Sequence, residues 1–441
     1  MELKKAREDV SIGLLGLGTV GTGVVKLLER NHVYIRKRLG RGLRLAAVAV
    51  RHPARARAVA LDRVRIVADP RRLLADPAID VVVELIGGIE PAKSLVLGAI
   101  AAGKDVVTAN KALLATHGQE VFQAAERAGV RLGFEGSVAG GVPIIRVLRQ
   151  ALAGDRNRAI YGIVNGTCNS ILTAMTDRGV EFHEALAEAQ AAGLAEADPS
   201  LDVDGTDAAQ KLSLLVMLAF GARCPVSSIH TEGIRRVGQL DVAFARELGY
   251  VIKLLAIAKD DGRSIEARVH PTMIPRASLL ADVRGAFNAV HVQGDALGPT
   301  MYVGEGAGML PTATSVLADI LDVAESRRRR DSPPPPPLGM PWADLRRARI
   351  RPIGSLEAEY YLRFLVLDRP GVLGRIAGIL GRHQISIASV IQKDRKRGTS
   401  VPIVIRTHGA LERNLVRALA EIGRLTVVSG KPVFVRIEDR L

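Results

Sequence analysis

The chain has few cysteines and no long hydrophobic run. Its two cysteines, Cys168 and Cys224, are too few for a disulfide framework and are typical of a reducing compartment. No apolar run approaches the roughly 18–20 residues of a membrane-spanning helix. The N-terminal stretch MELKKAREDV contains no apolar signal region. The sequence therefore predicts a cytoplasmic protein with no membrane partner.

Aromatic residues are also scarce, at 3% of the 441 residues, so Ala, Val, Leu and Gly must build the core. Hydrophobic residues make up 48% of the chain and charged residues 24%, which is typical of a globular protein. At about 100–200 residues per domain, this length predicts two to four domains.

Basic residues outnumber acidic ones, 61 to 46, and the formal net charge is +15. A nucleic-acid-binding protein is one explanation. The arginines, however, are scattered along the chain, apart from runs at residues 327–330 and 346–351 that flank a proline tract. We therefore expect no nucleic-acid partner, and we expect the positive charge to concentrate anionic substrates and cofactors.

The first 147 residues alternate short apolar runs with helix-like segments, which predicts a parallel α/β sheet. Strands are expected at residues 11–15, 45–50, 80–85 and 105–108, and helices at 20–29 and 91–102. Residues 148–310 form a second α/β region with a strand at 264–269, and a helix within 311–325 is expected to return to the first domain.

Residues 326–355 combine an arginine run with a proline tract. This composition predicts a semi-rigid, solvated linker, and a docking site for a proline-binding partner is the alternative. Residues 356–441 then read as strand, helix, two strands, helix and strand, which is the ferredoxin-like βαββαβ order. The strands are expected at 360–367, 385–392, 401–407 and 432–437, and the helices at 371–383 and 411–422.

A glycine-rich turn, GLGTVG, lies between the first strand and the first helix. Such a turn lets the backbone approach a pyrophosphate at the helix N-terminus, whereas an ordinary tight turn is the alternative. The motif predicts a Rossmann-type dinucleotide-binding domain. Its expected cofactor-binding residues are Gly16, Gly18, Thr19, Val20 and Gly21.

Arg51 follows the second strand, where NAD-binding proteins carry an acidic residue that binds the ribose. An arginine suits the 2′-phosphate of NADP instead, and Arg55 and Arg57 add positive charge nearby. We expect NADP to be preferred and NAD to be tolerated.

Acidic residues are concentrated before one apolar helix. We call this cluster the acidic box, and it comprises Glu196, Asp198, Asp202, Asp204 and Asp207. Asp207 and Lys211 are four residues apart, on one face of a helix expected to begin near Gly205, while Asp198 and Asp202 are expected on loops. A surface ion pair worth ~0–1 kcal/mol is one explanation.

The alternative explanation for the box is chemical. Carboxylates hold a substrate ammonium group, and a lysine donates to an oxygen that gains charge during hydride transfer. The box therefore favours an oxidoreductase that acts on the carbonyl or alcohol group of an aminated substrate.

The motifs together resemble the homoserine dehydrogenase family over nearly the whole chain. The matching residues are Gly193-Leu194-Ala195, Asp198-Pro199, Asp202-Val203, Gly205, Asp207 and Lys211, with supporting segments at 16–25, 81–88, 108–115, 134–145, 162–172 and 304–313. The resemblance implies NAD(P)H-dependent interconversion of L-aspartate 4-semialdehyde and L-homoserine, in threonine, methionine and isoleucine biosynthesis. It also implies that residues 148–310 form a catalytic and dimerisation domain.

The resemblance carries roles to single residues. Lys211 matches the catalytic proton donor and Lys111 a second lysine near the nicotinamide and the substrate. Glu196, Asp202 and Asp207 match substrate ligands, with Asp207 also catalytic, and Gly193 and Gly306 match residues that line the cofactor. Leu194, Ser170 and Gln210 depart from the common family residues, which leaves the shape of the pocket open.

The family also has a monovalent cation site and a regulatory domain. Glu135 would bind sodium through its carboxylate, and Val138, Gly140 and Val142 through backbone carbonyls, although an ordinary glycine-rich connection is the alternative. Residues 356–441 resemble an ACT domain, with L-threonine as the implied effector. Its expected regulatory turn is formed by Asp368, Pro370, Gly371, Val372 and Leu373.

Other functions remain open at this point. The ACT domain could serve dimerisation alone, and a homodimer or higher homo-oligomer is expected in either case. A regulatory protein that binds NADP and an amino acid without turnover is a second hypothesis, which the intact Lys111, Asp207 and Lys211 disfavour. A basic nucleic-acid-binding protein is the third.

Overall fold

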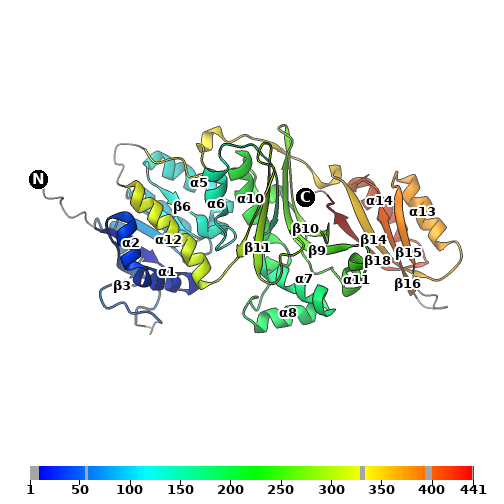
Figure 1. Ribbon diagram of the computed structural model, residues 1–441, viewed down its shortest axis with the longest axis horizontal. Coiled ribbons are helices and arrows are strands. Elements are labelled where there is room, and N and C mark those ends of the chain that lie inside the picture. The colour runs from blue at the N-terminus through cyan, green and yellow to red at the C-terminus, as the bar shows by residue number, and fades with distance from the viewer. Residues whose placement is uncertain (1–8, 55–57, 328–332, 393–399, 440) are drawn as a thin grey trace, which may run out of the picture. The chain divides into compact units, whose positions relative to one another are not determined.

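The computed structural model describes residues 9–54, 58–327, 333–392, 400–439 and 441. Arg55, Arg57 and residues 328–330 of the arginine run lie outside this set. The chain divides into two compact units (Figure 1). Unit 1 comprises Met1–Ile160, Gln210–Ser227 and Phe287–Ala348, and unit 2 comprises Tyr161–Ala209, Ser228–Ala286 and Arg349–Leu441. The units interleave along the sequence.

Unit 1 contains a six-stranded sheet in the order β3-β2-β1-β4-β5-β6, with every neighbouring pair parallel. The strands are β1 (Val10–Leu15), β2 (Leu43–Ala49), β3 (Arg65–Val67), β4 (Val81–Glu84), β5 (Asp105–Thr108) and β6 (Leu132–Gly133). This is the Rossmann order, in which ligands bind beyond the carboxyl ends of the strands beside β1. The predicted parallel α/β fold is confirmed.

Helices cover this sheet, and their apolar stripes supply the core. They are α1 (Thr19–Arg30), α2 (His32–Leu39), α3 (Arg71–Ala75), α4 (Ala92–Ala101), α5 (Lys111–Ala128) and α12 (Met309–Ser326). Val24 of α1 shares a buried cluster with Val316 and Ile320 of α12. The two helices approach closely because Gly23 has no side chain: a Cβ there would lie 2.5 Å from the carbonyl oxygen of Met309.

The proline-rich segment is partly packed, so the prediction of a solvated linker is wrong for its described residues from Leu338 to Leu345. Leu338, Trp342 and Leu345 are buried. The Trp342 ring stacks on Phe122 with centroids 6.1 Å apart, and the guanidinium of Arg223 lies 5.3 Å from its centroid. Composition indicated a spacer, but the apolar residues that follow the prolines find a partner in unit 1.

Unit 1 also contains short helices and an antiparallel pair of strands. These elements are the short helices η1 (Glu135–Ser137), α6 (Ile144–Arg146), η2 (Val147–Ala151), η3 (Val226–Ser228) and η4 (Trp342–Asp344), and the antiparallel pair β11 (Phe287–Gly294) and β12 (Pro299–Glu305). Strand β7 (Asn157–Ile163) and helix α10 (Thr206–Phe220) contain boundaries between the units along the chain.

Unit 2 is built on the long antiparallel pair β9 (Tyr250–Asp260) and β10 (Ser264–Pro275). Two short strands, β8 (His230–Thr231) and β13 (Arg349–Ile350), pair with β10. The helices of this part are α7 (Gly166–Arg178), α8 (Phe182–Ala191), α9 (Ser200–Val203) and α11 (Gln239–Glu247).

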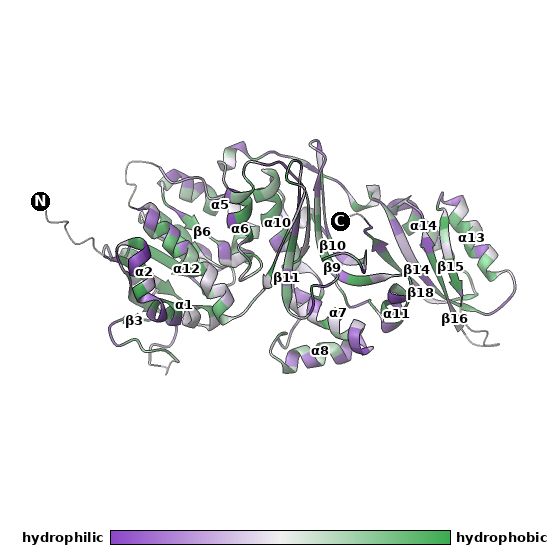
Figure 2. Ribbon diagram, viewed as in Figure 1, coloured by the Kyte–Doolittle hydropathy of each residue, from purple (hydrophilic) through white to green (hydrophobic). Residues whose placement is uncertain are grey.

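The C-terminal part of unit 2 has the predicted βαββαβ order. It begins after η5 (Ile353–Ser355) and comprises β14 (Glu357–Leu367), α13 (Val372–Arg382), β15 (Ile387–Gln392), β16 (Ser400–Thr407), β17 (Ala410–Leu411), α14 (Glu412–Ile422) and β18 (Val428–Ile437). The sheet order is β18-β14-β16-β15. Helix α13 carries hydrophobic and hydrophilic residues together (Figure 2), and its apolar face packs on Tyr360 and Leu362 of β14.

Strand β18 has a second partner. It is antiparallel to β14 and also parallel to the end of β10, where Thr272 pairs with Arg436 and Met273 with Ile437. The C-terminal sheet and the β9–β10 pair therefore form one continuous sheet within unit 2. None of the helices in the described part of the chain combines the length and apolar character required to span a bilayer.

Candidate active site

A cavity of about 420 Å³ lies at the carboxyl ends of β1, β2 and β4. Its lining includes Gly16 and Gly18 of the glycine-rich turn, Arg51 after β2 and Leu85 after β4. This is the position at which Rossmann sheets bind dinucleotides, because the strand order reverses beside β1. Three of the predicted cofactor residues, Gly16, Gly18 and Arg51, thus line one cavity. Its lining does not include the other six, which are Thr19, Val20, Gly21, Lys111, Gly193 and Gly306.

The three glycines of the turn fit separate roles. Gly16 has φ +94°, and a Cβ there would lie 2.8 Å from the carbonyl oxygen of Leu85, so the tight turn requires glycine. A Cβ at Gly21 would lie 2.4 Å from the carbonyl oxygen of Gly16, so this glycine allows the helix to pack on the strand. Gly18 caps α1, which begins at Thr19 and Val20, and faces open space. The open position beside the helix N-terminus suits a pyrophosphate.

Lys111 is the first residue of α5, and the preceding residues fix its backbone. The side chain of Asn110 accepts a hydrogen bond from the backbone N–H of Leu113, which caps the helix, and donates to the carbonyl of Gly88. Fully buried Glu84, at the end of β4, accepts from Thr108 Oγ1 over 2.6 Å. Glu84 and Asn110 were not predicted from the sequence. For Glu84 a signal was present, since it is an acidic residue at the end of the apolar run VVVE.

The acidic box is organised by a residue that sequence reasoning also missed. The side-chain nitrogen of Asn165 donates to Asp202 over 2.7 Å and to Asp207 over 2.8 Å. The side-chain oxygen of Asn165 accepts from the backbone N–H of Cys168, which caps α7. Both amide hydrogens are thus committed to carboxylates, and the cap fixes the amide. The signal was the segment GIVNGTCNSIL, whose asparagine stands where a helix begins.

Two details of the box differ from expectation. Asp202 lies in the short helix α9 rather than on a loop, because Pro199 starts a helical turn instead of only breaking the chain. Asp207 and Lys211 lie on one helix, as predicted, but their exposed fractions are 6% and 8%. A solvent-exposed ion pair therefore does not account for them.

The remaining residues of the box are exposed. Glu196 and Gly193 lie in the segment between α8 and α9, where Gly193 has φ +72°. Asp204 pairs with Arg235 over 2.5 Å, and Asp198 accepts from the backbone N–H of Ser200. A buried carboxylate at Asp207, a half-buried one at Asp202 and an exposed one at Glu196 together offer acceptors for an ammonium group.

The loop expected to bind sodium is buried and irregular. Glu135 accepts backbone hydrogen bonds from Ile145 and Arg146, each over 2.8 Å, and burial raises the pKa of its carboxyl. The carbonyl of Gly140 accepts from Ser315 Oγ over 2.7 Å. Each of these oxygens retains a lone pair, so the donor set is compatible with a hard cation.

The neighbourhood of this loop is crowded on one side. Val138 and Val142 are buried, and a Cβ at Gly140 would lie 2.4 Å from the carbonyl oxygen of Gly306. Gly306 in turn abuts fully buried Asn288, whose side-chain amide has no hydrogen-bond partner among the described residues. Such an amide is expected to contact a water or a bound group.

The turn expected to be regulatory joins β14 to α13. Gly371 caps α13 with φ +84°, and a Cβ there would meet no atom within 4 Å. Val372 is buried and Leu373 half-buried, whereas Pro370 is exposed. Together with Asp368, these residues form a compact strand-to-helix turn with an open side.

Comparisons with known proteins agree with this architecture. Family models described as "Homoserine dehydrogenase, NAD binding domain", "Homoserine dehydrogenase" and "ACT domain" match residues 16–135, 143–321 and 360–425. The homoserine dehydrogenase of Pseudomonas aeruginosa is 45% identical over 433 residues, covering 98% of this chain and 99% of that protein. That of Neisseria gonorrhoeae is 44% identical over 432 residues, with the same coverage.

Solved structures give the same result. The structure of a homoserine dehydrogenase from Thiobacillus denitrificans is 46% identical, with a TM-score of 0.93, and covers 98% of this chain and 99% of its own. A hyperthermophilic archaeal homoserine dehydrogenase in complex with NADPH is 26% identical, with a TM-score of 0.61, covering 72% and 98%. The chain therefore belongs to the homoserine dehydrogenase family and is an NAD(P)-dependent oxidoreductase with nucleotide-binding, catalytic and ACT domains.

Proposed function

We propose that the acidic box binds the amino group of L-homoserine and that Lys211 handles the proton of its hydroxyl. The observation that carries this proposal is the burial of Asp207 and Lys211 on α10, with one amide, Asn165, holding Asp207 and Asp202 together. Buried charges are costly unless they are paired or used, and a substrate ammonium group is a ligand that suits these carboxylates.

In the direction of reduction, Lys211 donates a proton to the carbonyl oxygen of L-aspartate 4-semialdehyde as negative charge develops on it. In oxidation it accepts that proton from L-homoserine. Glu196, Asp202 and Asp207 hold the ammonium group, and Lys111 orients the substrate beside the nicotinamide, which supplies or accepts the hydride when bound. Gly193 and Gly306 line the cofactor in this proposal.

We propose NADP as the preferred nicotinamide cofactor, with NAD tolerated. Arg51 lines the cavity at the end of β2, and its cationic side chain suits a 2′-phosphate. The archaeal relative in complex with NADPH supports the same choice.

Sodium at Glu135, Val138, Gly140 and Val142 is part of the proposal. The buried carboxylate and the carbonyls on irregular backbone supply hard oxygen ligands, and Ala139 and Gly140 have φ values of 54° and 52°. Sodium would neutralise part of the charge at Glu135, so we expect Na⁺ to raise the melting temperature more than an equal concentration of choline.

We also propose that L-threonine regulates the enzyme through the turn at Asp368–Leu373 and that the protein acts as a homodimer. The ACT domain and the open side of Gly371 support the first proposal. The buried thiols of Cys168 and Cys224 fit the proposed cytoplasmic location.

The deciding experiment measures NADP reduction on addition of L-homoserine at alkaline pH, in the wild type and in Asp207→Asn. We expect turnover in the wild type and a large rise in the KM for homoserine in the variant. A wild type that binds NADP without turnover would instead support a regulatory binding protein. Repeating the assay with L-threonine, and comparing NADP with NAD, tests the regulation and the cofactor preference.

A further inference from the structure

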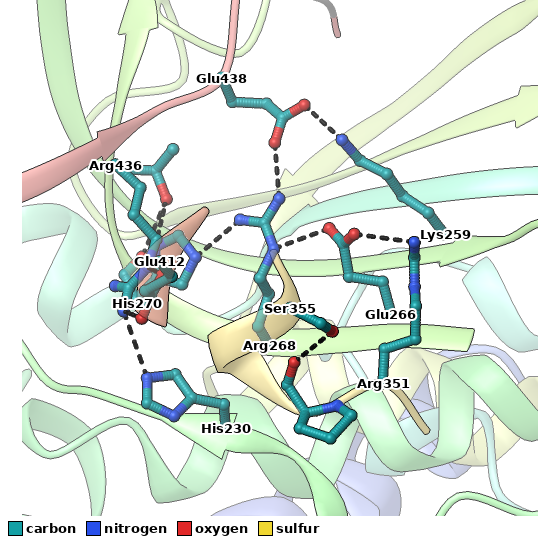
Figure 3. A network of polar contacts seen from close by, with 12 residues as sticks. His230, Lys259, Glu266, Arg268, His270, Arg351, Ser355, Glu412, Arg436 and Glu438 are labelled. Carbon is teal, nitrogen blue, oxygen red and sulfur yellow. Dashed lines mark hydrogen bonds and ion pairs between the residues drawn. The ribbon is translucent and has the colours of Figure 1, made fainter. Parts of the chain in front are cut away.

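A buried ionic network joins the last strand of the ACT domain to the catalytic part of unit 2 (Figure 3). At its centre is Arg436 of β18, which has a side-chain exposure of 2%. Its guanidinium donates to Glu412 over 2.7 and 2.6 Å and to Glu232 over 3.0 and 2.8 Å. Glu412 belongs to α14 of the same domain, whereas Glu232 follows β8 of the catalytic part. One side chain therefore connects the two parts through paired hydrogen bonds.

The contact with Glu232 is strongly charged. Burial alone would raise the pKa of Glu232, but hydrogen bonds from His230 and Arg436 outweigh it and hold the pKa well below its usual range. His230 Nε2 lies 2.7 Å from Glu232 Oε1, the oxygen that also accepts from Arg436 Nη2. Glu232 is thus an ionised residue held between two side chains from different elements.

The segment that carries Glu232, residues 231–234, packs against the acidic box. We call this segment the wall. The backbone N–H of Ile234 donates to the carbonyl of Val203 at the end of α9 over 2.8 Å. A Cβ at Gly233 would lie 1.9 Å from that carbonyl oxygen and 2.4 Å from the Cα of Asp204. The two backbones are therefore in direct contact, and a shift of residues 232–234 must move α9.

The same wall reaches the turn that begins α10. Gly205 has φ +86°, and a Cβ there would lie 3.1 Å from Thr231 Cγ2 and 3.2 Å from the carbonyl oxygen of Glu232. Gly205 separates Asp202, on α9, from Asp207, in the first turn of α10. Both carboxylates held by Asn165 thus depend on a backbone that residues 231–234 support.

We propose that Arg436 is a positioning residue for the acidic box, acting through Glu232 and the backbone of residues 231–234. The inference rests on the proposed function only in that the box binds the substrate. Arg436 contacts neither the box nor any proposed substrate ligand. Its effect is to keep the wall in one position, so that Asp202 and Asp207 stand at the correct separation for an ammonium group.

A second ion pair between the same parts provides a matched control. Arg363 of β14 donates to Asp241 of α11 over 2.6 and 3.0 Å, and the Asp241 side chain is fully buried. Asp241 otherwise accepts from Tyr361 Oη and the backbone N–H of Gly238, neither of which belongs to α9 or Gly205. Arg363→Met therefore removes an ion pair between the same two parts without touching the wall. This pair is the more buried of the two, since the Asp241 side chain is 0% exposed and that of Glu232 is 38% exposed.

The experiment compares Arg436→Met, Glu232→Gln, the double variant and Arg363→Met in the full chain. We expect Arg436→Met and Glu232→Gln each to raise the KM for homoserine roughly tenfold or more, since small misplacements of binding groups are costly. The KM for NADP should stay within about twofold, because the substitutions do not alter the residues proposed to bind the cofactor. The double variant should be no worse than the more affected single variant, as expected for residues that act as a unit.

Arg363→Met should lower the melting temperature as Arg436→Met does but leave the KM for homoserine unchanged. The inference is overturned if folded Arg436→Met keeps the wild-type KM, or if Arg363→Met raises it equally. Should Arg436→Met fail to fold, Glu232→Gln, which keeps the side-chain volume, decides alone on the same readout.

Amide hydrogen exchange separates this inference from the proposed function. Without any substrate, Arg436→Met and Glu232→Gln should increase exchange over residues 200–207, while Arg363→Met should not. Unchanged exchange in all variants contradicts the positioning role even if the wild type oxidises homoserine. If the wild type lacks turnover but the variants show this exchange pattern, the proposed function is refuted and the structural connection stands.

Discussion

The side-chain nitrogen of Asn165 lies 2.8 Å from Oδ2 of Asp207, so a capping residue at the start of α7 fixes a carboxylate at the start of α10. The second hydrogen of the same amide binds Asp202 over 2.7 Å. The spacing of the two carboxylates thus follows from the geometry of one planar amide, which makes Asn165 the most direct test of the box.

Asn165→Asp should disturb the box while preserving the helix cap. Aspartate still accepts from the backbone N–H of Cys168, but it replaces two donated hydrogen bonds by a third negative charge. We expect a loss of about 1–3 kcal/mol in the free energy of unfolding, typical of a buried group left unsatisfied. The KM for homoserine should rise as well. Urea unfolding and steady-state kinetics give the two values, and a variant with wild-type values in both would contradict this view of the box.

Lys211→Met should reduce kcat by about 10²- to 10⁴-fold, the usual contribution of a positioned acid or base. Methionine keeps most of the side-chain volume at this buried position, so the fold should persist. The KM for NADP should change little. Lys26, exposed on α1, provides the control, since Lys26→Met removes the same charge far from the box in sequence. A Lys211→Met enzyme with wild-type kcat would remove lysine from the mechanism.

Arg51→Asp should change the cofactor preference. The variant loses a charge-assisted hydrogen bond to the 2′-phosphate and gains an acid that accepts from a ribose hydroxyl. We expect the KM for NADPH to rise roughly tenfold to hundredfold, from the ~1.5–3 kcal/mol of such a bond. The KM for NADH should stay constant or fall. Initial rates with both cofactors decide the point, and equal effects on the two would show that Arg51 does not select between them.

The ionic network predicts a dependence of stability on pH through His270. This histidine is fully buried, and burial together with Arg436 and Arg268 holds its pKa well below the usual value, against an opposing effect of Glu232. Because the unfolded chain binds the proton near pH 6.5 and the folded chain does not, stability is retained above that pH. It is lost as the pH falls below it, by about 1.4 kcal/mol per pH unit at most.

His270→Gln isolates this contribution. Neutral glutamine can accept from the Arg268 guanidinium, which lies 2.7 Å from His270 Nε2, and donate to the carbonyl of Pro271, but it cannot titrate. The difference in unfolding free energy between wild type and variant should shift in favour of the variant between pH 6.5 and pH 5. A difference that is constant over this range would mean that His270 does not change its protonation state on unfolding.

Trp342 tests the packing of the proline-rich segment. The residue is 6% exposed and its ring contacts Phe122 and Arg223, so Trp342→Ala should cost about 3–5 kcal/mol, as truncation of a buried aromatic does. Trp342→Phe keeps the ring stack and should cost less. Thermal unfolding measures both. A solvated spacer would tolerate either substitution without a change in melting temperature.

Much of the fold followed from patterns that are local in sequence. Four of the six strands of the parallel sheet (β1, β2, β4 and β5) and the βαββαβ order of the ACT domain appear where apolar runs predicted them, within a few residues at each end. The short strands β3 and β6 were not predicted. The glycine-rich turn was predictable for the same reason. The strand before it and the helix after it, which identify it as a nucleotide-binding turn, are its neighbours in the sequence.

The errors and omissions share a different cause, which is that burial depends on distant partners. Residues 338–345 look like a spacer by composition, yet Trp342 finds Phe122 far away in sequence. Asn165 lies in a recognisable segment that does not reveal its distant partners, and Glu232 carries no motif of its own. Their importance comes from carboxylates and a guanidinium that only the fold brings to them, and no spacing rule connects Glu232 to Arg436.

The pairing of β18 with both β14 and β10 has a consequence for the order in which the chain is assembled during synthesis. Thr272 emerges from the ribosome long before Arg436, the residue it pairs with. Until then, the end of β10 has an open edge, and the arginine that supports the acidic box has not been made. Contacts of such long sequence separation form late and slowly. Activity should therefore develop in the nascent enzyme only after its last strand has docked, so that an incompletely translated chain would accumulate as a nucleotide-binding protein without full catalytic competence.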